Sequence, residues 1–301
     1  MSSFELAQPW RKLLYVKQGF PDNYVDETFL DALQKNVNVR AHKYWPTVLR
    51  TCAVSQHISG ITAFIAVFVH LYSGVLAPDR LMMWDAVTFA VGYVAWDVMA
   101  IGAGGGRRRF SIARRVLLIA LTLLLLTPTL KTLTLAISSD TIWALSAIMF
   151  LFSLVFHDYG STNSLKVRFP DSLSINAGIF ASILLASRLP SNTHVLGLML
   201  FAVLVFALLP VFRRTCRAKS TTSDIIMSTS LITLTTLLFA PISHSLMVWY
   251  LAGMVCVNFG CPWWLIRTQK YKSEIRGPWD EARIIKRLSS LDEGLLEGFV
   301  G

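Results

Sequence analysis

The sequence predicts an all-α, polytopic membrane protein, and three observations carry that prediction. Hydrophobic residues make up 54% of the 301 residues and charged residues only 15%, against about a quarter charged in soluble domains. Long apolar runs recur along the chain, as spanning helices of about 20 residues require. If the runs cross a membrane in alternating directions, most of the Lys and Arg residues fall on one side of it. These features exclude a disordered chain or a nucleic-acid-binding protein, although the net charge is +10.

Eight apolar segments predict eight transmembrane helices. Helices are expected rather than strands, because open strand edges cannot lie in lipid and no alternating runs indicate a barrel. The fourth and fifth segments are short, which fits tilted or partly buried helices. In chain order the segments are 48–76, 82–103, 112–130, 141–156, 173–187, 194–212, 225–241 and 246–266.

The distribution of Lys and Arg predicts the orientation of these helices. With the N-terminus in the cytosol, 25 of the 28 cations fall on the cytosolic side, and Arg80, Lys131 and Arg188 fall on the other. Cytosolic loops carry an excess of Lys and Arg, so we expect both termini to be cytosolic. The four cysteines show no zinc-site spacing and no disulfide pattern, and we expect no metal or other cofactor.

The chain is expected to have three parts. Residues 1–46 form a cytosolic segment, 47–266 the transmembrane domain and 267–301 a cytosolic tail. Each polar end is expected to contain an amphipathic helix at the membrane surface. Asp26 would cap the first helix, and Pro278 would occupy the first position of the second.

Polar side chains inside the predicted spans are candidates for function. A carboxylate costs about 2.5–3.5 kcal/mol at the centre of a span on insertion scales. Asp85 and Asp97 each follow a tryptophan near a span end, so we expect interfacial positions or helix-packing hydrogen bonds. Asn176 and Asn258 are expected to form interhelical hydrogen bonds.

The histidines give no predicted active site. His157 and Asp158 close the fourth span and could act as an acid–base pair, but a solvated helix end is the simpler interpretation. His57 and His70 are thirteen residues apart, which does not make a metal site.

Three glycines followed by three arginines, at 104–109, precede the third span. Such a run can cradle a phosphate, but we favour a flexible cytosolic loop whose cations set the topology. The cations would still attract anionic lipid headgroups, worth about 1 kcal/mol each. They are Arg107, Arg108, Arg109, Arg114 and Arg115.

Several blocks of the sequence resemble the PIG-C family. They include Trp-Arg-Lys-Leu-Leu-Tyr at 10–15, Gly-Phe-Pro-Asp-Asn-Tyr at 19–24, Asp-Tyr-Gly at 158–160, Ser-Leu-Ser-Ile-Asn at 172–176, and Gly-Pro-Trp-Asp-Glu-Ala at 277–282. The blocks follow the family order from residue 10 to 282.

The resemblance implies a subunit of the complex that transfers N-acetylglucosamine from UDP-GlcNAc to phosphatidylinositol. This reaction is the first step of glycosylphosphatidylinositol (GPI) anchor biosynthesis and takes place at the endoplasmic reticulum membrane. In this family the transferase fold belongs to another subunit, PIG-A, and PIG-H, PIG-P, PIG-Q and PIG-Y are further partners. The resemblance implies a non-catalytic subunit and supplies no catalytic residue. In agreement, the sequence has no Asp-x-Asp motif for a nucleotide sugar.

We therefore expect this chain to hold the catalytic subunit at the membrane and to help present phosphatidylinositol. An acidic pair behind an aromatic residue makes a poor lipid-facing surface, although first-turn carboxylates also suit a helix dipole. The expected partner contacts are Trp10, Pro21, Asn23, Tyr24, Trp279, Asp280 and Glu281.

Two other functions are compatible with the sequence. One is a secondary transporter or lipid scramblase, although the internal repeats usual in transporters are not found. The other is a self-contained lipid-modifying enzyme that uses His157 and Asp158.

Overall fold

The computed structural model describes residues 11, 15, 17–21, 24, 34–35, 42–99, 106–132, 134, 136–159, 171–272 and 275–276. Of these, the side chains of 34, 35, 99, 106–113, 115, 117, 171, 275 and 276 lie outside the description. The chain divides into two compact units, His42–Arg267 and Met1–Ala41 with Thr268–Gly301.

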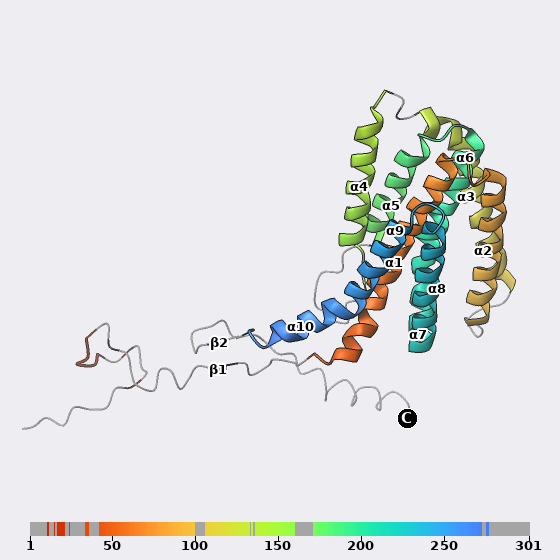
Figure 1. Cartoon of the computed structure of the whole chain (residues 1–301). Helices are drawn as coiled ribbons and strands as arrows, with labels where there is room; N and C mark the ends of the chain where they lie inside the picture. The colour runs from red at the N-terminus through yellow and green to blue at the C-terminus, as the bar shows by residue number, and fades with distance from the viewer. Residues whose placement is uncertain are drawn as a thin grey trace, which may run out of the picture. The chain divides into compact units, whose positions relative to one another are not determined.

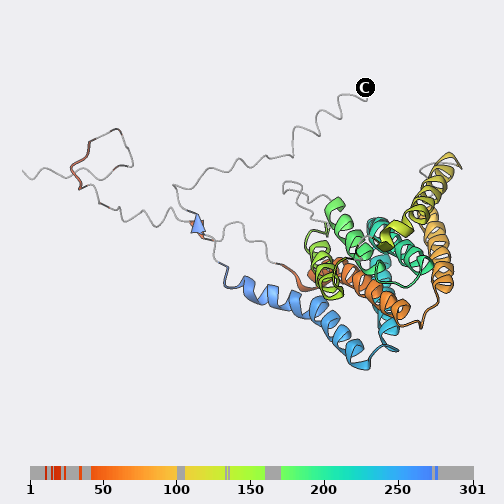
Figure 2. The same cartoon turned by 90° about the horizontal axis from the view of Figure 1, so that it is seen from above.

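The unit His42–Arg267 is helical wherever its secondary structure is described, which confirms the predicted all-α class (Figures 1 and 2). The helices described in this unit form eight rods, and these match the eight apolar segments. Two of the rods each combine two α-helices through a π-helical segment. The elements are α1 (Tyr44–Tyr72), α2 (Pro78–Met99), α3 (Gly106–Thr132), α4 (Ser139–Val155), α5 (Asp171–Ala186), α6 (Asn192–Ala202), η2 (Val203–Leu208), α7 (Leu209–Lys219), α8 (Thr221–Phe239), α9 (His244–Val255), η3 (Cys256–Gly260) and α10 (Cys261–Gln269).

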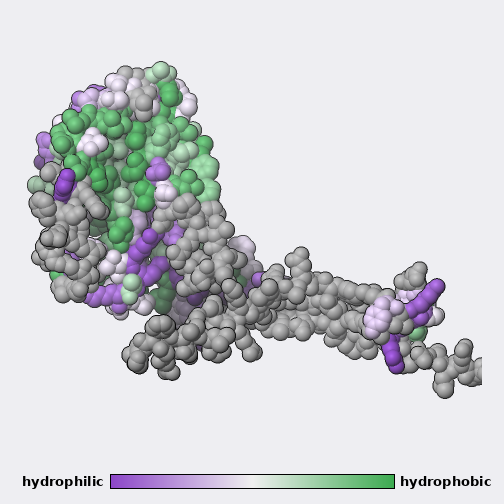
Figure 3. Space-filling view, turned by 180° about the vertical axis from the view of Figure 1, so that it is seen from behind, coloured by the Kyte–Doolittle hydropathy of each residue, from purple (hydrophilic) through white to green (hydrophobic). Residues whose placement is uncertain are grey.

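Four rods are long and apolar enough to cross a membrane by length and composition: α1, α6–η2–α7, α8 and α9–η3–α10. Leu118–Thr132, α4 and Ser172–Ala186 are shorter apolar helices. The remaining rod, α2, carries four charged residues in 22. Hydrophobic side chains cover much of the face of the helical unit seen in Figure 3. These features fit a helical membrane protein, while the count of eight spans and the cytosolic termini stay predictions.

Serine side chains cap the N-termini of three of the helices. Ser138 accepts a hydrogen bond from the backbone N–H of Thr141 at the start of α4, and Ser191 does the same for His194 in α6. Ser220 caps α8 by accepting from the N–H of Thr222 at 3.2 Å. Each cap satisfies one of the free N–H groups of a first helical turn.

Two expected cytosolic loops are helical, so those predictions are wrong. α7 continues to Lys219, and Ser220 alone separates it from α8, because this serine caps α8 directly. The glycine–arginine run is also not a loop throughout. α3 begins at Gly106 and includes residues 107–109, and arginine is a good helix former.

A proline follows each π-helical segment at the same spacing. Pro210 and Pro262 lie two residues after η2 and η3. A proline has no N–H, and its ring clashes with the carbonyl four residues earlier, which belongs here to Phe206 and Asn258. The wider π turn accommodates that missing bond. The prolines thus explain where each rod departs from α-helical geometry.

α1 lies in the middle of the helical unit and supplies the centre of its core. The ring of Phe64 in α1 lies 5.9 Å from that of Phe150 in α4 and 5.5 Å from that of Phe206 in η2. α5 reaches this cluster through Gly178, because an added Cβ there would lie 2.6 Å from a ring carbon of Phe206. The aromatic core therefore joins α1, α4, α5 and η2.

The other unit contains a short antiparallel ladder, β1 (Gln34–Lys35) with β2 (Ile275–Arg276). Gln34 pairs with Arg276 and Lys35 with Ile275. Two segments from opposite ends of the sequence are thereby joined. The ladder also makes Gln34 and Lys35 extended, within the stretch where we expected an amphipathic helix. The rest of that stretch and the tail helix at Pro278 lie outside the described residues.

Replacing Gly178 with alanine should lower the stability of the chain. The new methyl group would overlap the buried ring of Phe206, and overpacking of this kind costs about 1–3 kcal/mol. Gly253 in α9 is the matched control, since nothing lies within 4 Å of its added Cβ and alanine is the better helix former there. Thermal unfolding of the full chain in detergent measures both. Equal unfolding temperatures for the two variants would contradict the close approach at Gly178.

Candidate functional site

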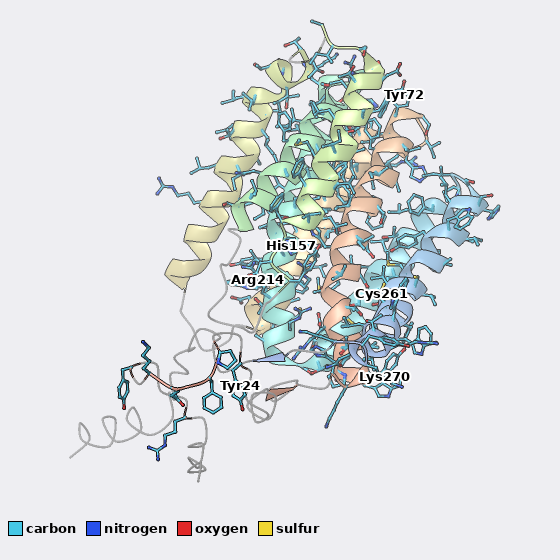
Figure 4. The ribbon with its side chains drawn as sticks, turned by 90° about the vertical axis from the view of Figure 1, so that its left-hand side faces the viewer. Tyr24, Tyr72, His157, Arg214, Cys261 and Lys270 are labelled. Atoms are coloured by element: carbon cyan, nitrogen blue, oxygen red, sulfur yellow. The ribbon has the colours of Figure 1, made fainter. Side chains whose placement is uncertain are left out.

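A buried polar cluster lies where α1, α5, α7 and the end of α4 meet. We use this name for His57 of α1, Ser153 of α4, His157 after α4, Ser174 of α5 and Arg213 of α7. All five are buried, and Arg213 and His157 are each only 5% exposed. Figure 4 shows the labelled His157 among the helices rather than at their outer edge. Polar groups in such a place need partners inside the protein.

His157 uses both ring nitrogens within this cluster. Nε2 accepts a hydrogen bond from Nη2 of Arg213, so Nδ1 carries the proton and donates to Oγ of Ser174 at 3.2 Å. Burial, and after it the His57 ring and the Arg213 guanidinium, lowers the pKa of His157 to about 3. The imidazole is therefore neutral near pH 7 and acts as a fixed acceptor for the buried cation.

The second histidine stacks on the first. The rings of His57 and His157 are parallel within 4°, with centroids 4.2 Å apart. Nε2 of His57 lies 3.3 Å from Oγ of Ser153. The hydroxyl of Ser174 donates to the carbonyl of Ser153 at 2.7 Å. Arg213 completes the cluster by donating from Nη1 to the carbonyl of Ala53 in α1 at 3.3 Å.

A second layer of polar contacts links α1 to α7 and α8. Nε of Arg217 donates to Oδ2 of Asp224 at 3.2 Å, and Nη1 donates to the carbonyl of Tyr159. Nε2 of Gln56 lies 2.8 Å from Oδ1 of Asp224 and 2.7 Å from Oγ of Ser228. The hydroxyl of Tyr159 donates to the carbonyl of Leu154 at 2.6 Å, and burial raises the pKa of this tyrosine to about 12.

The geometry of the buried polar cluster indicates that its side chains hold neighbouring helices together rather than carry out acid–base chemistry. A general base needs a ring nitrogen within reach of the substrate, and both nitrogens of His157 are held by Arg213 and Ser174. The expectation of a solvated helix end at His157 is wrong, because the ring turns inward and is buried. Within the described residues, no group of three His, Cys, Asp or Glu side chains could hold a metal ion.

The four polar residues singled out within the predicted spans have different environments. Asp85 is buried, and its Oδ2 has no hydrogen-bond partner in the described part of the chain. Asp97 is half-buried. Asn176 is exposed on α5, beside an apolar hollow between α4 and α5. Asn258 forms the predicted interhelical hydrogen bond, since its Oδ1 accepts from Oγ of Ser55 at 2.7 Å.

The expected lipid and partner contacts are described in part. Arg114 is exposed on α3, and the side chains of Arg107, Arg108, Arg109 and Arg115 lie outside the description. Pro21 and Tyr24 are exposed and form a turn, in which the Tyr24 N–H donates to the Pro21 carbonyl at 2.9 Å. Trp10, Asn23, Trp279, Asp280 and Glu281 lie outside the described residues.

Sequence reasoning missed the residues at the centre of this site. Arg213 is one of the 25 cations that the predicted topology assigns to the cytosolic side, and Gln56, Asp224 and Ser174 are not among the predicted site residues. The available signal was local: Arg213 directly follows an apolar run with no polar spacer. Its partner His157 lies 56 positions earlier, so no sequence pattern pairs them.

The fold and the buried polar cluster define a polytopic helical membrane protein whose internal polar groups join its helices. The model of the GPI2 family, phosphatidylinositol N-acetylglucosaminyltransferase, matches residues 10–280. The chain therefore belongs to this family, which confirms the resemblance drawn from the sequence blocks.

Relatives cover nearly the whole chain. A Dictyostelium discoideum protein whose name refers to a subunit of this transferase is 41% identical over 278 residues, which are 92% of this chain and 80% of that protein. A human protein named as a subunit of the transferase is 36% identical over 291 residues, covering 93% and 94%. The GPI2 subunit of Schizosaccharomyces pombe is 36% identical over 284 residues, covering 92% and 87%. No solved structure matches the chain.

Replacing Arg213 with glutamine should destabilise the chain, whereas the same change at Arg214 should not. The first variant leaves His157 Nε2 and the Ala53 carbonyl short of a buried donor, which costs about 1–3 kcal/mol. Arg214 is exposed, and exposed substitutions stay within about 0.5 kcal/mol. We expect unfolding temperatures lower by about 3–10 °C and by at most about 2 °C, respectively. Similar shifts for both variants would contradict the structural role of Arg213.

Proposed function

We propose that this chain is a membrane subunit of the complex that transfers N-acetylglucosamine from UDP-GlcNAc to phosphatidylinositol, the first step of GPI-anchor biosynthesis. The observation that carries the proposal is the family match over residues 10–280. The relatives named as subunits of this transferase also align with this chain over most of their own length. A shared activity is thus proposed for the whole chain rather than for one domain.

The proposed role is non-catalytic. The chain holds the catalytic subunit PIG-A at the membrane, with PIG-H, PIG-P, PIG-Q and PIG-Y as the other partners. The buried polar cluster supports this role, because it uses its histidines and Arg213 to join helices rather than to face a substrate. The proposed parts are a cytosolic segment at 1–46, a transmembrane domain at 47–266 and a cytosolic tail at 267–301.

The proposed location is the endoplasmic reticulum membrane, with eight spans and both termini in the cytosol. The one-sided distribution of Lys and Arg supports this orientation. In this proposed orientation α3 and its arginines would lie beside the cytosolic leaflet. The same side receives the tail with Trp279, Asp280 and Glu281, which remain proposed partner contacts together with Trp10, Pro21, Asn23 and Tyr24.

The test of the function is synthesis of GlcNAc-phosphatidylinositol from labelled UDP-GlcNAc, in microsomes from cells that lack this chain. We expect loss of the product and its return when the chain is expressed again. Normal product without the chain would overturn the proposal. The buried, unpartnered carboxylate oxygen of Asp85, in the described part of the chain, would then make a transporter or scramblase the function to examine.

Neutralising the arginines of α3 should lower the apparent affinity of the complex for phosphatidylinositol without causing its subunits to dissociate. Each cation near an anionic surface contributes about 1 kcal/mol, so the five together contribute about 5 kcal/mol. Because about 1.4 kcal/mol corresponds to a factor of ten, changing all five to glutamine should raise the phosphatidylinositol concentration for half-maximal rate by well over tenfold. The residues are Arg107, Arg108, Arg109, Arg114 and Arg115. Arg80→Gln, an exposed cation near the other end of the predicted spans, is the control.

Assembly is measured in the same membranes by co-purification of the other subunits. If assembly falls as much as activity, the arginines do not present lipid and the chain acts through attachment of its partners alone.

A further inference from the structure

Gln56, Asn176 and Asn258 are amide side chains within helices of the candidate transmembrane region, and the first and the last of them form hydrogen bonds inside the chain. Nε2 of Gln56 reaches Asp224 and Ser228 on α8. Asn258 accepts from Ser55 and donates to the carbonyl of Met254 at 2.8 Å. Asn176 differs, because it is exposed and the described residues give it no hydrogen-bond partner. Its amide is available to a partner outside this chain.

Asn176 lies in a hollow of about 480 Å³ between α4 and α5. The two helices lie side by side in the helical unit (Figure 1). Every other side chain that lines the hollow is apolar: Met149, Phe152, Leu173, Ala177 and Phe180. The hollow is thus an apolar groove with one amide in its wall.

The residues that α5 contributes have the spacing of a helix-packing face. Leu173, Asn176, Ala177 and Phe180 stand at positions i, i+3, i+4 and i+7 and share one side of α5. Ser174, two residues before Asn176, points the other way and joins the buried polar cluster. α5 therefore has one face used inside the chain and a second, opposite face that α4 covers only in part.

The acyl chains of lipids do not satisfy the amide in this groove. Acyl chains have no hydrogen-bonding groups, and an unsatisfied polar group in hydrocarbon costs several kcal/mol. Exposed hydroxyls on α8 avoid this cost, since Thr229 and Thr233 donate to backbone carbonyls four residues earlier at 3.0 Å and 2.8 Å. Asn176 has no such bond within the described part of the chain. The groove is suited to an occupant that supplies both apolar surface and a hydrogen-bonding group.

We propose that the α4–α5 groove binds a transmembrane helix of another subunit, which places a polar side chain or a backbone carbonyl opposite Asn176. A helix meets both needs, because its own backbone is satisfied inside the bilayer while its side chains offer apolar surface and a polar group. The small side chain of Ala177 allows close approach beside the hydrogen bond, as at other membrane helix contacts. The assignment of that helix to a transferase subunit rests on the proposed function.

Site-specific photocrosslinking in membranes that contain the complete complex tests this proposal. A photoreactive aromatic residue replaces Phe180 in the groove, which is 43% exposed, or Leu151 on α4, which is 61% exposed and does not line it. We expect the Phe180 position to give an adduct that mass spectrometry assigns to a membrane span of a co-purifying subunit. The Leu151 position should give mainly lipid adducts.

Changes at the amide separate a hydrogen bond from simple proximity. Asn176→Leu should lower the yield of the Phe180 adduct about three- to tenfold, the range for loss of one hydrogen bond between membrane helices. Asn176→Gln keeps an amide and should retain most of the yield. Ala177→Phe, which fills the groove, should abolish the adduct. Unfolding temperatures of the variants show whether the chain itself stays folded.

Three results would overturn the proposal. They are lipid adducts alone at Phe180, an adduct between two copies of this chain, or a yield unchanged by Asn176→Leu and Ala177→Phe. The microsomal assay keeps this outcome separate from the proposed function. If the wild-type chain restores synthesis but Phe180 yields lipid adducts, only the groove proposal fails. If it does not restore synthesis, the proposed function fails whatever the crosslink.

Discussion

The burial of the Arg213 guanidinium is the constraint on which much of the helical unit depends. A cation that is 5% exposed in an apolar bundle is tolerated only if its donors have acceptors. The acceptors come from α1, through the Ala53 carbonyl, and from the segment after α4, through His157. Because His157 in turn donates to Ser174, one side chain fixes the mutual positions of α1, α4, α5 and α7.

The π-helical segments that precede Pro210 and Pro262 both contact the central helix, α1. The π segment before Pro210 contains Phe206, whose ring packs on Phe64 of α1 and against Gly178 of α5. The segment before Pro262 contains Asn258, which accepts from Ser55 of α1. In both cases the residue whose carbonyl the proline ring would meet also contacts α1. The two π-helical segments therefore lie where neighbouring helices contact the central helix, α1.

Hydropathy was sufficient to find the helices, because each rod must present an apolar surface over most of its length. The eight rods follow the eight predicted segments for that reason. The predictions are wrong where a single local interaction sets the start of a helix. At Ser220 the side chain caps α8, so α8 begins at once and the expected loop is absent. Helix propensity lets α3 begin within the glycine–arginine run, which composition alone had assigned to a loop. The polar cluster lay beyond prediction because its contacts join distant positions: Arg213 meets the Ala53 carbonyl across 160 positions, and spacing rules detect partners only within a helical turn.

The division between satisfied and unsatisfied polar groups suggests how a membrane subunit can be both stable alone and specific in assembly. Asn258, His157 and Arg213 form their hydrogen bonds inside the chain, as does Nε2 of Gln56, so changes there act first on folding. Asn176 makes none within the described residues and stands on a face that folding does not require to be polar. Hydrogen-bonding groups inside a bilayer find few competing partners, so one amide in an apolar groove is enough to set the register of a neighbouring helix. If the proposed helix binds the α4–α5 groove, folding and assembly depend on different faces of the same helix, α5.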